Sequence, residues 1–305
     1  MENNSKKLVG RFAPSPSGRM HLGNIFAALM SYISAKKVGG QWIVRIEDLD
    51  KERCRPEYAD DILRDLEWLG LLWDSAVVRQ SERDDLYLAS FNMLKEKSLL
   101  YPCFCTRADL LSSSAPHAAD GIRIYPGTCR NLKTFEIGEL QKNRRPAWRI
   151  RVSGTDEFTD GHYGRQRANL ASDVGDFIVR RADGNFAYQL AVCVDDSAQG
   201  VSQVVRARDL LSSAHQQRFL YQNLGLSAPQ FSHIPLILSP DGRRLSKRDK
   251  DCSMAFLRER FSAEEIIGKL MFLSGFLKEN RPVTISDSLS LFSWEKLVKE
   301  DIVLQ

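Results

Sequence analysis

The sequence has no long hydrophobic run and no apolar stretch close to its start. Its longest apolar runs, such as IPLIL at 234–238, are far shorter than the roughly 20 residues that a membrane-spanning helix needs. The opening residues MENNSKK are polar or charged, and no hydrophobic core of a secretory signal follows them. We therefore expect neither a membrane span nor a secreted protein, and predict a cytoplasmic location.

A strong excess of charge of one sign is also missing. The chain has 43 Lys and Arg against 39 Asp and Glu, a balance that permits nucleic-acid binding without requiring it. Basic clusters occur at 142–151, 165–167 and 243–250, and each alone is compatible with an ordinary solvated surface. The 305 residues, 43% of them hydrophobic, fit a globular protein of roughly two domains.

The GxGxxG loop of dinucleotide-binding proteins is absent as well. Between the first predicted strand and helix the chain has instead APSPSGRMHLGN. The pattern predicts a strand over 7–14, an amphipathic helix over 22–37, a strand over 41–50 and a helix that begins at Pro56. This alternation predicts an α/β fold with a parallel sheet and ligands at the carboxyl ends of its strands.

The loop before the first helix has the composition of a phosphate site. The start of a helix carries unpaired backbone N–H groups and the positive end of its dipole. Gly23 lets a ligand approach the backbone, and His21 and Asn24 add donors for oxygen atoms. The simpler interpretation is a glycine turn before an amphipathic helix with a surface histidine.

The regular alternation stops after residue 100. Segment 101–172, with grouped cysteines and short strands, is predicted to be an insertion between 1–100 and 173–250, and 251–305 is predicted to be helical. A β-hairpin is predicted over 176–196, around the dipeptide Asp183-Gly184, followed by a helix over about 208–224. Two helix-capping boxes are also predicted, Ser81 with Asp84 and Ser262 with Glu265.

A second motif, RLSKR, lies at 244–248 in a basic loop after a predicted strand. Together the two loops resemble the HIGH and KMSKS motifs of class I aminoacyl-tRNA synthetases, which bind ATP from the two halves of a split Rossmann-type fold. Asn24 replaces the last residue of the first motif, and Arg244 replaces the first lysine of the second. The resemblance implies that 1–100 and 173–250 are those two halves, and that Mg²⁺ accompanies ATP. The residues it implies for ATP are His21, Gly23, Asn24, Ser246 and Lys247, with His21 and Lys247 catalytic.

Four further stretches, in order along the chain, resemble the catalytic core of glutamyl-tRNA synthetases. They are RFAPSPSG, RIEDLD, FAYQLAVCVDD and RARDLL, which begin at residues 11, 45, 186 and 206. The resemblance implies a glutamate pocket formed by Arg11, Phe12, Ala13, Pro14, Ser15, Glu47, Tyr188 and Arg206.

The residue types fit that ligand. Arg11 and Arg206 suit bidentate contacts to carboxylates, Glu47 suits the ammonium group, and Tyr188 adds a hydroxyl. Taken singly, Glu47 is equally a surface charge at a strand end, and Tyr188 a core aromatic.

Few residues follow the KMSKS-like loop. Full-length glutamyl enzymes continue into a helical anticodon-binding region, whereas this sequence has only 251–305. It thus resembles the truncated branch of the family, the glutamyl-Q tRNA(Asp) synthetases. That resemblance implies a monomer that activates L-glutamate with ATP and transfers it to queuosine, the wobble base of tRNA(Asp). The alternatives are a compact glutamyl-tRNA synthetase that charges the tRNA 3′ end, another HIGH-type nucleotidyltransferase, and a zinc-containing RNA-binding protein, which leaves both ATP motifs unexplained.

Six cysteines are present, and in a cytosolic protein we expect them to be reduced. Cys103, Cys105 and Cys129 are grouped, and with Tyr125 they resemble the structural zinc site in the insertion of this family. His117 is an alternative fourth ligand and the chemically more usual one. Without a metal, these would be three reduced thiols in a small β-structure.

Overall fold

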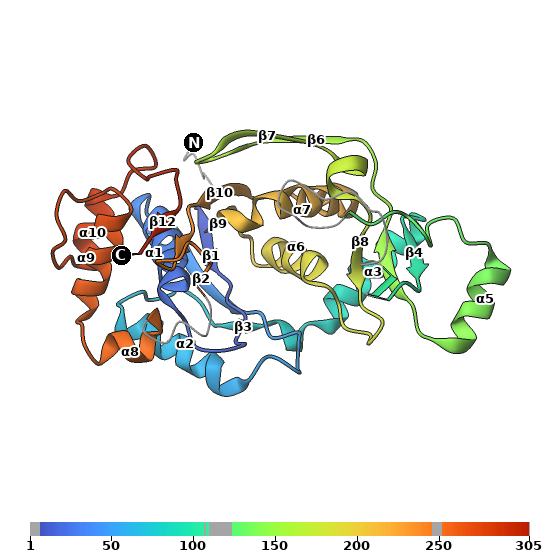
Figure 1. Ribbon diagram of the computed structural model, residues 1–305, viewed down its shortest axis with the longest axis horizontal. Coiled ribbons are helices and arrows are strands. Elements are labelled where there is room, and N and C mark those ends of the chain that lie inside the picture. Colours follow the sequence, from blue (N-terminus) through green and yellow to red (C-terminus); the bar gives the residue numbers. More distant parts are fainter. Residues whose placement is uncertain (1–6, 107, 110–123, 246–251, 305) are drawn as a thin grey trace, which may run out of the picture.

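The computed structural model describes residues 7–106, 108–109, 124–245 and 252–304. A five-stranded parallel sheet with the order β10-β9-β1-β2-β3 lies at its centre (Figure 1). Its strands come from both ends of the sequence, so that Gly10 of β1 is paired with Gln203 of β9. The strands are β1 (Val9–Phe12), β2 (Gln41–Ile46), β3 (Val78–Arg79), β9 (Gln203–Ala207) and β10 (Gln230–Ile234). The predicted α/β class and parallel sheet are confirmed.

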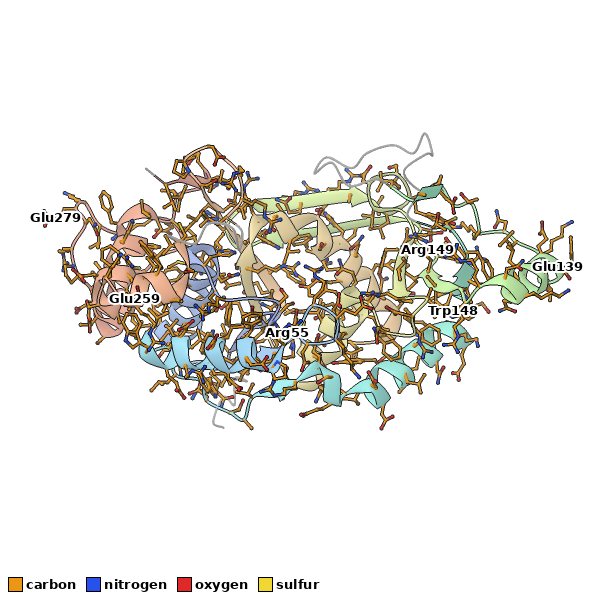
Figure 2. The ribbon with its side chains drawn as sticks, turned by 60° about the horizontal axis from the view of Figure 1, so that its bottom comes forward. Arg55, Glu139, Trp148, Arg149, Glu259 and Glu279 are labelled. Atoms are coloured by element: carbon orange, nitrogen blue, oxygen red, sulfur yellow. The ribbon has the colours of Figure 1, made fainter. Side chains whose placement is uncertain are left out.

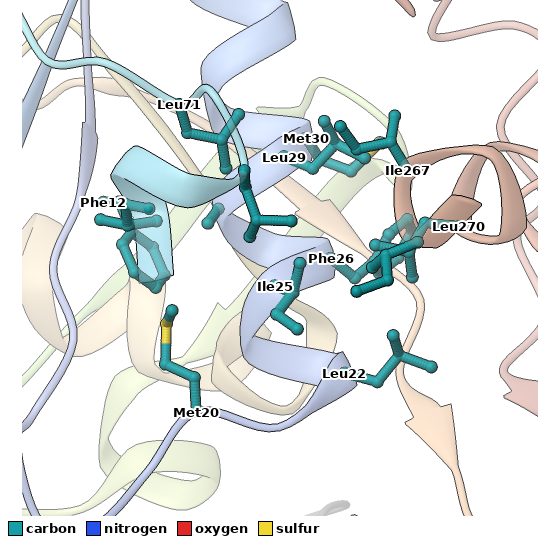
Figure 3. Packing of buried hydrophobic residues seen from close by; sticks show 14 of the residues in the cluster. Phe12, Met20, Leu22, Ile25, Phe26, Leu29, Met30, Leu71, Ile267 and Leu270 are labelled. Atoms are coloured by element: carbon teal, nitrogen blue, oxygen red, sulfur yellow. The ribbon is translucent and has the colours of Figure 1, made fainter. Parts of the chain in front are cut away.

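Helix α1 (Leu22–Lys37) is the main support of this sheet, and its bounds are those predicted. It connects β1 to β2 and packs against β1 and β9. Its buried apolar side chains, among them Ile25, Phe26 and Leu29, meet Ile267 and Leu270 on the opposite side of the core (Figure 3). Helix α2 (Pro56–Trp68) follows β2 and begins, as predicted, with proline in its first turn.

A second core lies on the other side of the sheet. It is formed by α3 (Asp84–Glu96), α6 (Tyr188–Ala198) and α7 (Leu211–Leu224), with buried side chains such as Tyr87 and Leu220. Helix α6 contacts both α3 and α7. The start of α6 is thereby held next to the carboxyl ends of the central strands.

The insertion extends away from the central sheet, with α5 (Thr134–Asn143) at its far end (Figure 1). Its antiparallel sheet has the order β4-β5-β8. Strand β8 comes from the segment predicted to resume the catalytic half, yet it pairs with β5. In Figure 2, Trp148 and Arg149 mark this sheet and Glu139 marks α5. The strands are β4 (Leu100–Cys103), β5 (Ala147–Ile150) and β8 (Phe177–Arg180).

A long hairpin returns from the insertion to the central sheet. It consists of β6 (Thr155–Asp160) and β7 (Gly164–Asn169), and it runs beside α7 and β10. At its tip, Gly161 N–H donates to the carbonyl of Phe231 at 2.8 Å. A Cβ at Gly161 would lie 2.2 Å from Ser232 Oγ, so this close approach requires glycine.

The C-terminal region, predicted to be helical, contains three helices, α8 (Met254–Arg258), α9 (Ala263–Leu273) and α10 (Ile285–Leu291), but more than half of its described residues are non-helical. Helix α9 begins with the predicted capping box of Ser262 and Glu265. Two short parallel strands, β11 (Ile237–Leu238) and β12 (Ile302–Val303), attach the end of this region to the catalytic half. Within the described residues, no helix combines the length and apolar character needed to cross a membrane.

Three local predictions were wrong. The second strand of the hairpin predicted over 176–196 is helix α6, because residues after the turn are buried as a helix that packs against α3, α7 and β8. Ser81 does not cap α3. Its backbone N–H and hydroxyl both donate to the Asp48 carboxylate at 2.8 Å, and the helix starts after Arg83. Strand β2 ends at Ile46, not within the acidic residues that follow.

Candidate functional site

A cavity of about 420 Å³ lies at the carboxyl ends of β1, β2, β9 and β10. This is where parallel α/β sheets bind their ligands. Every sequence-predicted glutamate or ATP residue with a described position lines it: Arg11, Phe12, Ala13, Pro14, Ser15, His21, Gly23, Asn24, Glu47, Tyr188 and Arg206. Ser246 and Lys247 lie outside the described residues.

The start of α1 forms one wall of the cavity. His21 is the residue that precedes the helix, and its backbone N–H donates to Asn24 Oδ1 at 3.1 Å. The oxygen of Asn24 therefore caps the helix, a use that sequence reasoning did not foresee. A Cβ at Gly23 would lie 3.2 Å from the His21 ring, so glycine lets the imidazole fold over the helix start.

Both flanks of the predicted KMSKS-like loop lie beside this wall. Arg244 and Leu245 line the cavity, and Arg244 forms an ion pair with Asp209 at 2.5 Å. After the loop, Ser253 forms a β-bridge with His21. The chain therefore leaves the cavity just before Ser246 and returns next to the start of α1.

Glu47 also lines the cavity and is buried. Its backbone N–H donates to the carbonyl of Pro14 at 3.0 Å, which ties the end of β2 to the loop after β1. Arg45 Nη2 donates to Glu47 Oε1 at 3.2 Å. Burial raises the pKa of Glu47 against the opposing pull of Arg45 and Arg11. The carboxylate is held by the protein and faces the cavity with its remaining acceptor sites.

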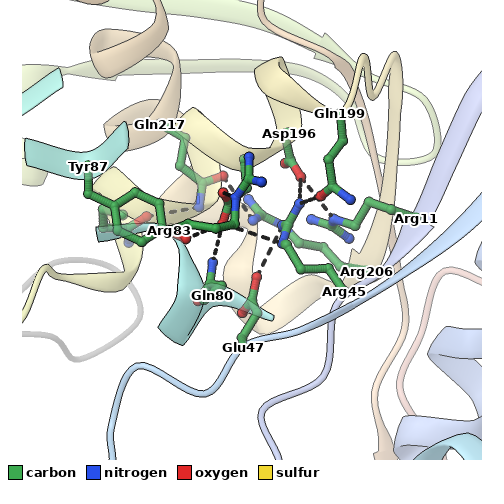
Figure 4. Close-up of polar contacts among 12 residues, drawn as sticks. Arg11, Arg45, Glu47, Gln80, Arg83, Tyr87, Asp196, Gln199, Arg206 and Gln217 are labelled. Atoms are coloured by element: carbon green, nitrogen blue, oxygen red, sulfur yellow. Dashed lines mark hydrogen bonds and ion pairs between the residues drawn. The ribbon is translucent and has the colours of Figure 1, made fainter. Parts of the chain in front are cut away.

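Arg45 is the centre of a buried ionic network (Figure 4). Its Nη1 lies 2.8 Å from Asp196 Oδ1 and donates to Gln199 Oε1 at 2.8 Å. Arg11 approaches the same carboxylate, with its Nε 3.5 Å from Asp196 Oδ1. Asp196 on α6 thereby supplies a buried counter-charge for Arg11 at the cavity wall.

The neighbouring carboxylate of α6 is fully buried and has a separate set of partners. Asp195 accepts hydrogen bonds from Gln80 at 2.8 Å, Arg83 at 2.6 Å and Tyr87 at 2.7 Å. These partners come from α3 and the short turn before it. Asp195 therefore locks α6 against α3 and so fixes the position of Tyr188, the first residue of α6.

Arg206 on β9 supplies the second guanidinium of the cavity and is buried. It donates from Nε to His233 Nε2 at 3.0 Å, from Nη1 to Gln217 Oε1 at 2.9 Å, and from Nη2 to the carbonyl of Leu210 at 3.1 Å. Burial lowers its pKa and raises the pKa of the nearby Tyr188 hydroxyl. Tyr188 therefore keeps its proton and is a hydrogen-bond donor at neutral pH.

The three grouped cysteines meet in the insertion, with all their sulfur atoms within 4.8 Å of one another. Tyr125 Oη lies 3.4 Å from Cys103 Sγ and 3.6 Å from Cys105 Sγ, and it accepts the backbone N–H of Cys129 at 2.8 Å. His117 lies outside the described residues. Three sulfurs and one phenol oxygen fit the tetrahedral donor set of zinc.

Electrostatics around this cluster also fit a cation. Burial raises the pKa of the Cys105 thiol to about 11. At Cys103, burial is outweighed by hydrogen bonds from Tyr125 and from Arg149, whose Nε donates to Cys103 Sγ at 3.3 Å, and the thiol pKa is lowered. A bound metal ion would favour the thiolate form of its cysteine ligands.

Comparison with known proteins is consistent along the whole chain. Residues 7–300 match the catalytic domain of class I tRNA synthetases (E and Q). A glutamyl-Q tRNA(Asp) synthetase of Nitratidesulfovibrio vulgaris is 43% identical over 96% of this chain and 94% of its own. One of Thiobacillus denitrificans is 48% identical over 81% of this chain and 80% of its own. The chain belongs to the glutamyl-Q tRNA(Asp) synthetase family.

Solved structures agree with this assignment. A glutamate tRNA ligase from Elizabethkingia meningosepticum, crystallised in complex with its amino acid, superimposes with a TM-score of 0.81 at 26% identity. The match covers 98% of this chain and 67% of that one. As a member of its family the chain is a ligase of the aminoacyl-tRNA synthetase type, and the class I catalytic fold is confirmed.

The sequence analysis did not select some residues that hold the cavity side chains in place. Arg45, Asp195 and Asp196 lie inside the quoted stretches RIEDLD and FAYQLAVCVDD, yet only Glu47 and Tyr188 were chosen from them. A charged residue between Val44 and Ile46 in an apolar strand was the available signal, because such a charge requires buried partners.

Proposed function

We propose that this chain activates L-glutamate with ATP as glutamyl-adenylate and transfers the glutamyl group to queuosine at the wobble position of tRNA(Asp). The observation that carries the proposal is that one cavity brings together the guanidinium groups of Arg11 and Arg206, the Glu47 carboxylate, the Tyr188 hydroxyl and the start of α1, with the Arg244–Asp209 ion pair also in its lining. This set complements an amino acid with two carboxylates next to a polyphosphate.

In the activation step, a glutamate carboxylate pairs with Arg11 and the other with Arg206, while Glu47 pairs with the ammonium group. Tyr188 donates a hydrogen bond from its hydroxyl group to the substrate. An oxygen of the substrate α-carboxylate then attacks the α-phosphorus of ATP, and the bond to the bridging oxygen of the β-phosphate breaks, which releases pyrophosphate. The protein contributes positioning more than covalent chemistry.

The ATP side of the site stabilises negative charge. The backbone N–H groups at the start of α1 and the His21 side chain face the phosphates, and Gly23 keeps that approach open. Lys247 and Ser246 follow a chain segment that ends at the cavity, which supports their assignment to the phosphates. Mg²⁺ bound with ATP would supply further charge compensation on the phosphate oxygens.

In the transfer step, a hydroxyl of the queuosine ring attacks the carbonyl carbon of the adenylate, and AMP leaves. The names of the relatives support this acceptor. The alternative is the 3′-terminal ribose of a tRNA, which the likeness to a glutamate tRNA ligase would favour. Both acceptors use the same activated glutamate, so the cavity alone does not distinguish them.

We further propose that Cys103, Cys105, Tyr125 and Cys129 hold one structural zinc ion. A closed set of four ligands leaves no position for substrate, so the metal would stabilise the insertion. The three thiols must stay reduced to bind the metal, which supports a cytoplasmic enzyme.

Two measurements test the proposal. Glutamate-dependent exchange of pyrophosphate into ATP, without tRNA, should occur, and glutamine should not replace glutamate. Labelled glutamate should then attach to tRNA(Asp) from queuosine-making cells and not to tRNA(Asp) from cells unable to make queuosine. Blocking the 3′-terminal ribose by a method that spares queuosine should leave attachment intact. Glutamate found on the 3′-terminal ribose would instead establish a compact glutamyl-tRNA synthetase.

A further inference from the structure

A buried chain of hydrogen bonds connects the hairpin of the insertion to the cavity. Arg206 and His233 are direct neighbours on the parallel strands β9 and β10. His233 is fully buried, and its two ring nitrogens lie near different partners. Nε2 is 3.0 Å from Arg206 Nε, and Nδ1 is 2.6 Å from Asp160 Oδ2 at the end of β6.

The chemistry of the two partners fixes the state of the imidazole. A guanidinium N–H only donates, so His233 Nε2 must accept. The proton of the neutral ring is then on Nδ1, from which it donates to Asp160. Burial, reinforced by the charge of Arg206, lowers the pKa of His233 to about 4, so the ring is neutral at physiological pH.

Asp160 is itself held in place by the hairpin turn. Its Oδ1 accepts the backbone N–H groups of His162 at 3.0 Å, Tyr163 at 2.9 Å and His233 at 3.1 Å. Burial of the carboxyl is outweighed by the hydrogen bonds from His233 and these backbone groups, and the pKa of Asp160 is lowered. Asp160 is therefore an ionised acceptor of fixed orientation.

The rest of the Arg206 guanidinium is constrained in the same way. Gln217 accepts from Arg206 and donates its own amide to Gln189 Oε1 at 2.8 Å, so the amide cannot rotate without losing a bond. Three of the five guanidinium N–H groups bind His233, Gln217 and Leu210 among the described residues. At most two remain for a substrate carboxylate, and their direction is set by the three that are bound.

We propose that Asp160 and His233 are positioning residues that aim the Arg206 guanidinium at a carboxylate of the amino acid substrate. This inference rests on the proposed role of Arg206 in binding glutamate. It makes the insertion part of the amino acid site, because the β6–β7 hairpin supplies the anion that selects the tautomer of His233. Asp160 then favours acidic substrates although it does not contact them.

The test compares two identical substitutions on the same strand. In Asp160→Asn, the backbone donors keep the amide oxygen at the Oδ1 position, and the amide nitrogen then faces His233 Nδ1. That nitrogen donates a hydrogen bond to His233 Nδ1, so the ring proton moves to Nε2. Two donors, His233 Nε2–H and Arg206 Nε–H, then face each other. Asp156→Asn is the matched control, because Asp156 also lies on β6 and binds a histidine, His215, at 2.7 Å, away from the cavity.

Glutamate-dependent ATP–pyrophosphate exchange is measured on the full chain, with KM for glutamate and for ATP and with thermal unfolding. Asp160→Asn should raise the glutamate KM about tenfold or more and leave the ATP KM unchanged, since one buried donor of Arg206 loses its acceptor. Asp156→Asn should leave both KM values unchanged. A rise in both KM values with Asp160→Asn, or an equal effect of the control, would show a merely structural role and overturn the inference.

Two variants of His233 separate loss of folding from loss of orientation. His233→Gln keeps an acceptor near the Nε2 position and should stay within about threefold of the wild-type glutamate KM, whereas His233→Leu should resemble Asp160→Asn. Arg206→Ala examines the proposed function itself and should raise the glutamate KM. If it does so while Asp160→Asn and His233→Leu remain at the wild-type value, the inference alone is wrong. If Arg206→Ala has no effect, the proposed glutamate site is wrong.

Discussion

The guanidinium of Arg45 lies 3.2 Å from the carboxylate of Glu47, and both side chains are buried. They stand two residues apart at the end of β2, so they point to the same face. Arg45 also contacts Asp196, which approaches Arg11. Arg45, which does not line the cavity, thus connects Glu47, the proposed partner of the substrate ammonium group, to Arg11, a proposed partner of a substrate carboxylate.

Arg45→Met should strongly destabilise the protein. The substitution leaves Glu47 and Asp196 buried without their main counter-charge, and loss of one partner from a buried ion pair typically costs about 3–5 kcal/mol. Urea unfolding followed by circular dichroism measures the change. A loss below about 1 kcal/mol would mean that water or other groups solvate the carboxylates, and that Arg45 is not the centre of the network.

The affinity for glutamate should weaken as the solution becomes acidic. Burial raises the pKa of Glu47, so the carboxylate is protonated at a higher pH than an exposed one, and it then loses its attraction for the substrate ammonium. The glutamate KM should therefore rise as the pH falls from about 8 to about 5.

The contribution of Glu47 to folding stability changes with pH in the opposite direction to the affinity for glutamate. A carboxyl with a raised folded-state pKa stabilises the protein less as pH rises from the unfolded value through the folded one.

The variant Glu47→Gln should have a high glutamate KM with a much flatter pH dependence. An unchanged pH profile in this variant would assign the titration to another residue.

Arg11→Ala should raise the glutamate KM while the ATP KM stays close to the wild-type value. It leaves a substrate carboxylate unpaired, and a hydrogen bond to a charged group contributes about 1.5–3 kcal/mol, or roughly ten- to 150-fold. Arg11→Lys should recover only part of the loss, since the planar fork is replaced by a point charge. Exchange kinetics over a range of glutamate concentrations measure this effect. If neither variant changes the glutamate KM, Arg11 does not bind the substrate.

Lys247→Ala should slow formation of the adenylate about a hundredfold and change the glutamate KM little. The expected effect is that of removing one charge contact to the reacting phosphates, about 3 kcal/mol. Single-turnover measurement of pyrophosphate release reports this step directly. Arg243→Ala is a useful control, because this residue of the same basic stretch bonds Asp241 and is not part of the motif. Normal exchange in Lys247→Ala would contradict the assignment of the second motif.

Metal analysis of the purified protein should find about one zinc per chain, and Cys105→Ser should lower that content. The insertion should loosen in this variant, which limited proteolysis detects, while glutamate-dependent exchange persists because the metal supports its own module. Cys54→Ser, outside the cluster, is the matched control. A fully active and equally protease-resistant protein without metal would contradict a structural zinc site.

Local sequence patterns predicted several elements well. The bounds of α1, the proline start of α2 and the capping box at Ser262 depend on residues close in sequence, and all three are confirmed. The hairpin predicted over 176–196 failed because residues after the turn find apolar partners on α3 and α7, which local pattern does not encode. Tertiary packing decided between two structures that the turn allowed.

The same distinction applies to the site. Residues proposed to contact the ligand were selected from motifs, and the structure brings those with described positions to one cavity. Their supports were missed, because Asp160 and His233 become neighbours of Arg206 only after three strands have been brought together. A buried hydrogen-bond partner at such a distance leaves no regular spacing in the sequence.

The pairing of β1 with β9 also dictates when the enzyme becomes complete during synthesis. Gly10 has its partner in Gln203, so one edge of β1 is unpaired until most of the chain has left the ribosome. Contacts of such long separation form slowly and expose apolar surface in the meantime. The cavity, which needs β1 and β9 together, is thus among the last features to form, and a ligand bound in it would report that the nascent chain has closed its central sheet.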